Sequence, residues 1–174
     1  MHSTLSAGAC FPEITLPTLS DGEVTLGSRG EGEWALVVVY RGQHCPLCTK
    51  YLKQLTLLHP AFGEAKVGVV AVSGDSEAQA RSQMDEVKPS FPVAYGLDVE
   101  GMRALGCYIS DPRSDKETDH PFAEPALFVV NGEGAVQIAD ISNAPFARPD
   151  LEALLSGVKF VRANDYPIRG MHTD

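Results

Sequence analysis

Continuous apolar runs and helically spaced apolar positions alternate along the first half of the chain. Residues 34–40 (WALVVVY) form an uninterrupted apolar run rich in β-branched side chains, which is typical of a strand buried on both faces of a sheet. Apolar residues then recur at helical spacing up to His59-Pro60, where the proline is expected to end a helix. Residues 67–72 (VGVVAV) repeat the buried-strand pattern, so this region predicts a right-handed βαβ unit with parallel strands.

The second half of the chain shows the same alternation with a polar interruption. Ser76 and Gln79 fit a capping box at the start of a second helix that ends before Pro89. The polar stretch 110–124 (SDPRSDKETDHPFAE) predicts a long loop. The other predicted elements are a short strand at residues 91–95, a short helix at 99–105, an antiparallel hairpin of 125–130 and 135–139 with its turn at 131–134, and a terminal amphipathic helix from Leu151 to Val161.

Length and composition predict a single domain spanning residues 1–174, because 174 residues with 44% hydrophobic content can form one core. The formal net charge of −9, with only 14 lysines and arginines, disfavours nucleic acid as a partner. The N-terminal sequence MHSTLSAGACFPE lacks the pattern of a signal peptide, and the longest apolar run is too short to cross a bilayer. We therefore expect a cytoplasmic protein that binds neither nucleic acid nor membranes, either as a monomer or as a homodimer.

Two of the four cysteines, Cys45 and Cys48, lie close together in the sequence Cys-Pro-Leu-Cys. Cytoplasmic thiols are kept reduced, so a close pair indicates redox or metal chemistry rather than a structural disulfide. A zinc site is the less favoured hypothesis because no second CxxC or HxxxH follows. A chemically inert pair of cysteines is a further alternative. Cys10 and Cys107 are interpreted as small buried hydrophobic residues.

The position of the pair at the start of the first predicted helix favours redox chemistry. Pro46 suits the first helical position, which places Cys45 at the N-cap, where unpaired N–H groups and the helix dipole stabilise an anion. Arg41 and a protonated His44 would lower the pKa of Cys45 further if their side chains turn toward the sulfur. Cys48, one turn later, is predicted to point inward. We therefore expect Cys45 to attack and Cys48 to resolve the resulting mixed disulfide.

The order βαβ, insertion, ββα, with CxxC at the start of the first helix, resembles the thioredoxin fold, an α/β fold around a central mixed sheet. The segment EPALFVVNGE (residues 124–133) is similar to the thioredoxin segment in which a cis-proline precedes a strand and a turn. In that family the proline lies beside the cysteines and shapes the groove for the substrate. The resemblance therefore implies a substrate-positioning role for Pro125.

A resemblance over nearly the whole chain is to the peroxiredoxin-like AhpC/TSA family, which adds an N-terminal extension and an insertion to the thioredoxin-like fold. It rests on the segments FPEITLP, DGEVTL, VVVYRG, YGLD and ALG. The peroxidatic signature of that family is a proline, three residues, Thr or Ser, two residues and then cysteine. With Cys48 in the peroxidatic position, Cys45 stands in the Thr/Ser position and Arg41 in the proline position. With Cys45 in the peroxidatic position, Gly42 stands in the Thr/Ser position and Val38 in the proline position. Neither alignment therefore meets the signature.

The dithiol and the missing signature favour a thiol-disulfide oxidoreductase, an antioxidant enzyme that uses Cys45 and Cys48. One alternative is a thiol-dependent hydroperoxide reductase, in which one cysteine becomes a sulfenic acid and the other condenses with it. Another is a non-enzymatic redox sensor or adaptor. The enzymes would act on a disulfide or hydroperoxide, carried by a protein or a small molecule, with a thioredoxin- or glutathione-type reductant and no bound cofactor or metal. Arg148 is interpreted as a surface arginine before a helix, the alternative that the peroxiredoxin resemblance implies being a contact with a peroxide or the thiolate. His120 is interpreted as a solvated loop residue.

Overall fold

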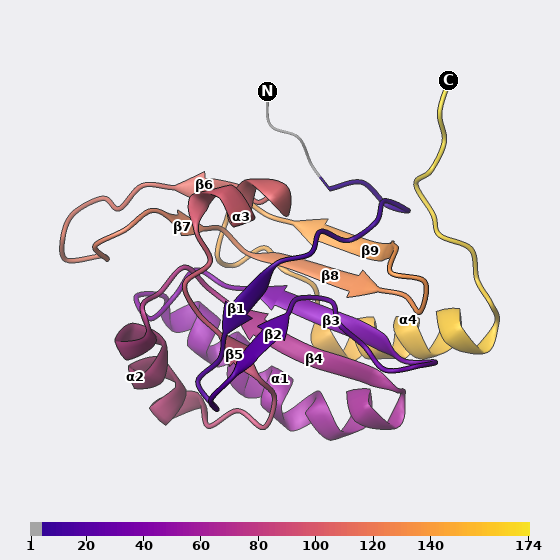
Figure 1. The fold of residues 1–174 in the computed structure, drawn as a ribbon, viewed down its shortest axis with the longest axis horizontal. Coiled ribbons are helices and arrows are strands. Elements are labelled where there is room, and N and C mark those ends of the chain that lie inside the picture. The colour runs from indigo at the N-terminus through magenta and orange to yellow at the C-terminus, as the bar shows by residue number, and fades with distance from the viewer. Residues whose placement is uncertain (1–4) are drawn as a thin grey trace.

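The computed structural model describes residues 5–174, which form a central five-stranded sheet with helices on one face and shorter elements on the other (Figure 1). The strands are β1 (Thr15–Pro17), β2 (Glu23–Thr25), β3 (Trp34–Val39), β4 (Val67–Val72), β5 (Val93–Ala94), β6 (Ile109–Ser110), β7 (Phe122–Ala123), β8 (Ala126–Val130) and β9 (Val136–Ile141). The helices are α1 (Pro46–Glu64), α2 (Glu77–Val87), α3 (Val99–Ala104) and α4 (Leu151–Ala163).

The central sheet has the strand order β5-β4-β3-β8-β9 and is mixed. Strands β3, β4 and β5 run parallel, whereas β8 is antiparallel to both β3 and β9. The predicted βαβ unit is therefore confirmed as β3-α1-β4, and the predicted terminal hairpin as β8-β9. Because β3 lies in the middle of the sheet, its carboxyl end brings the start of α1 to the centre of one sheet edge.

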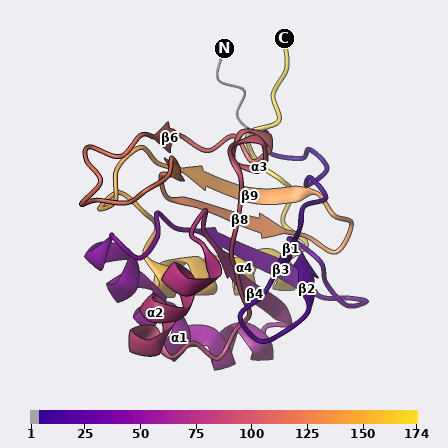
Figure 2. The ribbon, with the colours of Figure 1, turned by 60° about the vertical axis from the view of Figure 1, so that its left-hand side comes forward.

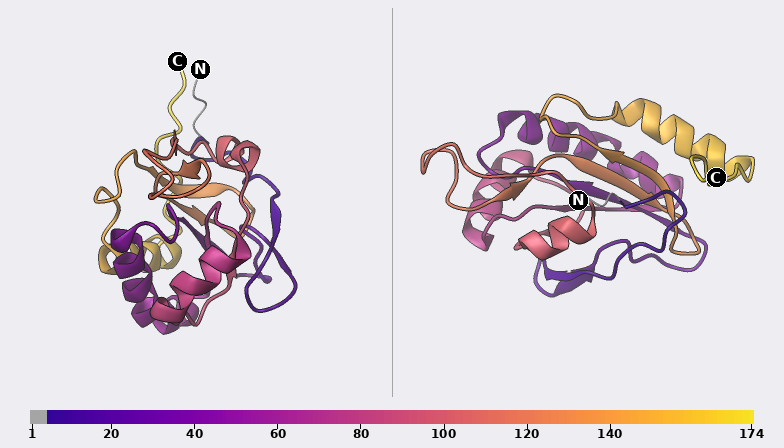
Figure 3. Two further views of the ribbon diagram at one scale, coloured as in Figure 1. Left: turned by 90° about the vertical axis from the view of Figure 1, so that its left-hand side faces the viewer. Right: turned by 90° about the horizontal axis from the view of Figure 1, so that it is seen from above.

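Two apolar layers pack against the sheet. Helices α1, α2 and α4 cover one face, and their core includes Leu52, Met84 and Leu155. The β1-β2 hairpin and α3 cover the other face, where Leu26 and Met102 are buried (Figure 2 and Figure 3). Strand β3 sends alternate side chains into each layer, which explains its continuous apolar sequence. No helix among residues 5–174 is both long and apolar enough to cross a membrane.

Helix α1 extends to Glu64, so the prediction that it ends at His59-Pro60 is wrong. Pro60 is exposed, and its ring removes only one N–H donor from the helix. The next turn carries Phe62, which is completely buried in the core. A proline inside a helix costs about 3 kcal/mol, and burying a phenylalanine side chain contributes about 1.5–3 kcal/mol. The burial of Phe62 therefore offsets most of the cost of continuing the helix through the proline.

The stretch 110–124, predicted as a loop, has paired ends. Strand β6 pairs with β7 in an antiparallel ladder that joins Ile109 to Ala123 and Ser110 to Phe122. The β1-β2 hairpin is likewise formed by short strands that the apolar pattern does not predict. Both hairpins have only two or three residues in each strand, too few for an alternating pattern to stand out in the sequence. The capping box of Ser76 and Gln79 at the start of α2 is confirmed.

Candidate dithiol site

The two cysteines lie where β3 leads into α1, and Cys45 is the N-cap of that helix, as its sequence predicts. Its backbone is extended, with φ −110° and ψ 100°, and Pro46 follows at the first helical position. The Cys45 sulfur accepts a hydrogen bond from the Cys48 backbone N–H at 3.3 Å. The sulfur thus occupies the place where a capping side chain satisfies a free amide at the positive end of the helix dipole.

Both sulfurs are inside the protein. Cys45 is 1% exposed and Cys48 is completely buried, within the core formed by the helices and one face of the sheet. The inward orientation predicted for Cys48 is confirmed. The low exposure of Cys45 means that only a small reactant, or a local opening of the chain, gives access to the pair.

The pair is arranged to hold one negative charge on Cys45. The pKa of Cys45 is lowered because the Cys48 thiol and backbone donate hydrogen bonds to its sulfur, with further help from Arg41 and the charge of Arg148. The pKa of Cys48 is raised, first by burial and then by its hydrogen bond to Cys45. A thiolate next to a thiol that donates to it is the state that these contacts favour.

Arg148 contacts the second cysteine, so the prediction of a surface arginine is wrong. Its Nη2 donates to the Cys48 sulfur at 3.3 Å, and the two residues are 100 positions apart in the sequence. The Arg148 Nε donates to the Pro145 carbonyl at 2.7 Å, and the guanidinium lies 4.9 Å from the centre of the Tyr51 ring. The Tyr51 hydroxyl in turn donates to the Pro149 carbonyl at 2.7 Å. The turn before α4 is thereby fixed to α1 with its arginine on the dithiol.

The other predicted positioning residues separate into two groups. Arg41 lies near Cys45, and its guanidinium helps to lower the pKa of that thiol. His44 instead packs against Phe122, with ring centres 4.4 Å apart. Burial, and then the positive charge of Arg41, lowers the pKa of His44, which disfavours the cationic form that would stabilise the thiolate.

Pro125 lies on the Arg148 side of the site. It lines a small pocket together with Tyr51, Arg148 and Pro149. Its peptide bond is trans, because residues 5–174 contain no cis peptide bond. The resemblance to the thioredoxin segment therefore extends to the place of Pro125 in the fold and not to its geometry.

Three contacts tie the segment between β6 and β7 to the dithiol region. His120 Nε2 lies 3.2 Å from the fully buried Asp75 carboxylate, so this histidine is not simply solvated. Asp75 also accepts the Gln43 backbone N–H at 2.7 Å. Glu117 lies 4.0 Å from Arg41, and Asp119 accepts a hydrogen bond from a side chain of α2 at 3.0 Å. A polar cleft of about 690 Å³ opens between this segment and His44.

The remaining two cysteines lie away from the pair. Cys107 is completely buried, as predicted, and burial raises its pKa to about 12. Cys10 is exposed, contrary to the prediction, and lies on the N-terminal segment, where it bridges to Ala135. Within residues 5–174, no three His, Cys, Asp or Glu side chains are grouped so as to hold a metal ion.

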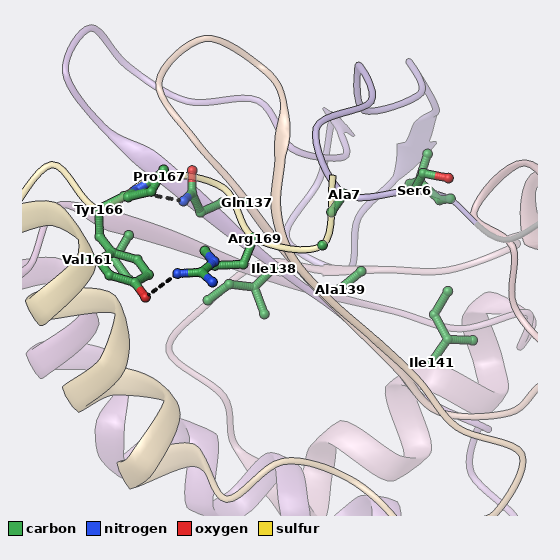
Figure 4. Close-up of a pocket in the computed structure, with 12 residues that line it drawn as sticks. Ser6, Ala7, Gln137, Ile138, Ala139, Ile141, Val161, Tyr166, Pro167 and Arg169 are labelled. Carbon is green, nitrogen blue, oxygen red and sulfur yellow. Dashed lines mark hydrogen bonds between the residues drawn. The ribbon is translucent and has the colours of Figure 1, made fainter. Parts of the chain in front are cut away.

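A second hollow lies along β9, and neither cysteine of the pair lines it. Its volume is about 600 Å³, and Ile138, Ala139 and Ile141 lie along one wall (Figure 4). Arg169 and Tyr166 also line it, and Arg169 Nη1 donates to the Tyr166 hydroxyl at 2.8 Å. None of the described residues that line it is a cysteine.

Sequence reasoning missed Glu124, which forms an ion pair with Arg41 at 3.0 Å and is 5% exposed. The one available signal was a charged residue directly between two apolar pairs, Phe122-Ala123 and Pro125-Ala126, at the end of the polar stretch. A carboxylate in such a position requires a partner when it is buried.

The mixed sheet and the dithiol at the start of α1 define a thioredoxin-like α/β protein. Residues 7–139 match the model of the AhpC/TSA family, and the chain belongs to that family. Comparison with curated proteins gave no match.

Solved structures of peroxiredoxin type share the fold. Mycobacterium tuberculosis AhpC superposes with a TM-score of 0.73 at 19% identity, covering 94% of this chain and 96% of its own. A peroxiredoxin-like protein from Aquifex aeolicus gives 0.74 at 19% identity, with coverage of 91% and 89%. A cysteine-to-serine mutant of peroxiredoxin 6 of Arenicola marina gives 0.78 at 16% identity, with coverage of 91% and 75%. The predicted fold class is thus confirmed.

Proposed function

We propose that this protein is a thiol-dependent hydroperoxide reductase in which Cys45 and Cys48 form the redox-active pair. The observation that carries the proposal is the Arg148 guanidinium on the Cys48 sulfur at 3.3 Å, beside a Cys45 thiol whose pKa Arg41 and Arg148 help to lower. Membership of the AhpC/TSA family supports peroxide as the oxidant. These findings favour peroxide reduction over the disulfide exchange that the sequence motif suggested first.

The reaction follows from the unequal thiols. The Cys45 thiolate attacks one oxygen of the hydroperoxide, the O–O bond breaks, and the departing alkoxide takes a proton, leaving Cys45 as a sulfenic acid and an alcohol as product. The Cys48 thiol then condenses with the sulfenic acid, which releases water and forms the Cys45-Cys48 disulfide. Two thiols of an external reductant restore the dithiol and leave as a disulfide.

The two arginines suit the transition state of the first step. Negative charge spreads from sulfur over both peroxide oxygens as the O–O bond breaks, and fixed cationic donors stabilise that charge most strongly where water is excluded. Both sulfurs are buried, so water is largely excluded here. A small hydroperoxide fits such a site better than a folded protein disulfide does.

Thiol-disulfide exchange is the second candidate, and the Cys-Pro-Leu-Cys sequence with a lowered pKa at Cys45 favours it. The same pair would attack a substrate disulfide instead of a peroxide. When Cys48 is aligned with the peroxidatic cysteine, Cys45 occupies the Thr/Ser position of the family signature. A dithiol mechanism directly explains a cysteine at that position.

Stopped-flow oxidation of the reduced protein by hydrogen peroxide and by an organic hydroperoxide tests the proposal. We expect oxidation at least about 10²-fold faster than that of a free thiol, since one positioned donor is worth about that factor. Cys45→Ser should lose the fast phase, whereas Cys48→Ser should keep it and accumulate a sulfenic acid at Cys45. Cys107→Ser, which removes a buried thiol outside the pair, is the matched control and should react like the wild type.

Other outcomes would redirect the assignment. A rate no faster than that of a free thiol would eliminate the peroxidase, and catalytic reduction of a model disulfide would then support the second candidate. A fast phase that survives Cys45→Ser and disappears in Cys48→Ser would reverse the roles of the two cysteines. With neither activity, a change of partner affinity on oxidation would indicate a redox sensor.

A further inference from the structure

A buried carboxylate lies against Arg41, the arginine that helps to lower the pKa of Cys45. Glu124 follows β7 directly, and its Oε2 is 3.0 Å from the Nε of Arg41. Its other oxygen, Oε1, accepts a hydrogen bond from the Ser110 hydroxyl at 2.7 Å. Its backbone N–H donates to the Tyr108 carbonyl at 2.8 Å. The β6-β7 hairpin therefore fixes Glu124 through both its side chain and its backbone.

Arg41 is enclosed by the same hairpin. Its guanidinium lies 4.8 Å from the centre of the Phe122 ring. The side chains of Arg41 and Glu124 are only 16% and 7% exposed, so water screens their attraction weakly. A free arginine side chain has many rotamers, and ordering it costs free energy that a fixed partner offsets. The ion pair with Glu124 is made at Nε, so the outer nitrogens of the guanidinium remain available as donors.

We propose that Glu124 is a positioning residue that holds the guanidinium of Arg41 against the Cys45 sulfur, and that the β6-β7 hairpin serves the dithiol through this carboxylate. The inference rests on the proposed function only in taking Cys45 as the reacting thiol. It gives the polar insertion a role at the site without placing any of its residues on the substrate.

The competing explanation is that Glu124 only neutralises a buried cation. The two explanations predict opposite signs. If Glu124 is merely a counter-charge, removing it strengthens the positive field at Cys45, and the pKa of that thiol falls further. If Glu124 holds Arg41 in place, removing it lets the guanidinium leave the sulfur, and the pKa of Cys45 rises.

Glu124→Gln separates the two explanations. The pKa of Cys45 is measured from the ultraviolet absorbance of its thiolate during a pH titration of the full chain, with Cys45→Ser in the same background subtracted. We expect a rise of about one pH unit or more, the usual effect of losing a neighbouring opposite charge. The matched control is Glu117→Gln, because Glu117 is similarly buried, lies 4.0 Å from Arg41 and pairs more closely with Arg113 at 3.0 Å. The control should leave the pKa of Cys45 within a few tenths of a unit of the wild type.

A double-mutant comparison guards against a structural disturbance. In an Arg41→Ala background, Glu124→Gln should no longer raise the pKa of Cys45, because its effect passes through Arg41. A rise of the same size in both backgrounds, or an unchanged or lower pKa in Glu124→Gln itself, overturns the proposal. If Glu124→Gln unfolds the protein, Ser110→Ala takes its place, because it frees one oxygen of the Glu124 carboxylate and keeps the charge. The pKa of Cys45 must then rise by less than the change expected for Glu124→Gln.

The titration uses no peroxide. A protein that shows the expected shift and fails to reduce hydroperoxides would reject the proposed function and leave the role of Glu124 in place. A protein that reduces hydroperoxides rapidly, and whose Cys45 pKa does not change in Glu124→Gln, would support the proposed function and reject the role of Glu124.

Discussion

Arg148 shows how one side chain connects distant parts of the chain at the reacting pair. It donates to the Cys48 sulfur, to the Pro145 carbonyl and stacks near the Tyr51 ring. A guanidinium held on three sides loses little freedom when substrate enters, so its donors are ready for the charge that develops on the peroxide. Its place also means that a lysine, a point charge without the planar fork, cannot reproduce all three contacts.

We predict that Arg148→Ala slows the oxidation of the dithiol by hydrogen peroxide by about 10²–10³-fold, the loss expected for one transition-state donor. Arg148→Lys keeps the charge and should recover part of that loss. Stopped-flow oxidation of the reduced variants measures both rates. Arg103→Ala, which removes an exposed arginine on α3, is the control and should leave the rate unchanged. A loss of less than about threefold in Arg148→Ala would show that the contact with Cys48 has no part in the reaction.

Local sequence predicted the near part of the site and could not predict the distant part. Pro46 placed Cys45 at the N-cap because that relation is decided within two residues. The contact of Arg148 with Cys48 depends on how the turn before α4 closes on α1, 100 residues along the chain. His44 faces Phe122 and not the sulfur, and only the pairing of β6 with β7 brings that ring beside it.

At the scale of elements, α1 shows a conflict between local and tertiary preferences. Its apolar spacing predicted the helix, and its proline predicted an end that the buried Phe62 overrides. The proline thus remains inside the helix, where it removes one backbone hydrogen bond.

We predict that Pro60→Ala raises the free energy of unfolding by about 1–2 kcal/mol. Restoring a helical N–H and a favourable residue contributes up to about 3 kcal/mol, and the more flexible unfolded chain takes back about 1 kcal/mol. Urea unfolding of the reduced protein measures the change, and the midpoint should rise with an unchanged slope. Leu57→Ala alters a residue of the same helix that is 81% exposed, and should change stability by no more than about 0.5 kcal/mol. A less stable Pro60→Ala would mean that the proline ring itself packs favourably.

At the scale of the whole molecule, the central strands were the most predictable part of the fold. Strands β3, β4 and β8 are buried on both faces, so their sequences are continuously apolar and stand out. The short strands β1, β2, β6 and β7 depend on pairing with each other, which a single sequence does not reveal. The functional site is predictable to a similar extent. The two cysteines lie close together in the sequence and could be recognised there, whereas the charged side chains around them are brought together only by the tertiary fold.

The folded molecule should also register the charge on Cys45 as a dependence of its stability on pH. An unfolded cysteine has a pKa of about 8.5, and the folded protein lowers the pKa of Cys45 below that value. Between the two pKa values the native state has lost a proton that the unfolded state keeps, so stability rises with pH in this window. The stabilisation is complete above the unfolded pKa and is lost as pH falls toward the folded pKa.

We therefore predict that the free energy of unfolding of reduced wild-type protein, minus that of Cys45→Ser, increases between about pH 6 and about pH 8. The slope can reach about 1.4 kcal/mol per pH unit. Urea unfolding under a reducing atmosphere at several pH values measures it. Cys107→Ser is the control, because the pKa of Cys107 is raised to about 12 and that thiol stays protonated in both states below about pH 8. For Cys107→Ser the difference in free energy of unfolding from the wild type should not change with pH. If the difference for Cys45→Ser is equally independent of pH, Cys45 is a neutral thiol near pH 7, and the proposed order of attack has to be abandoned.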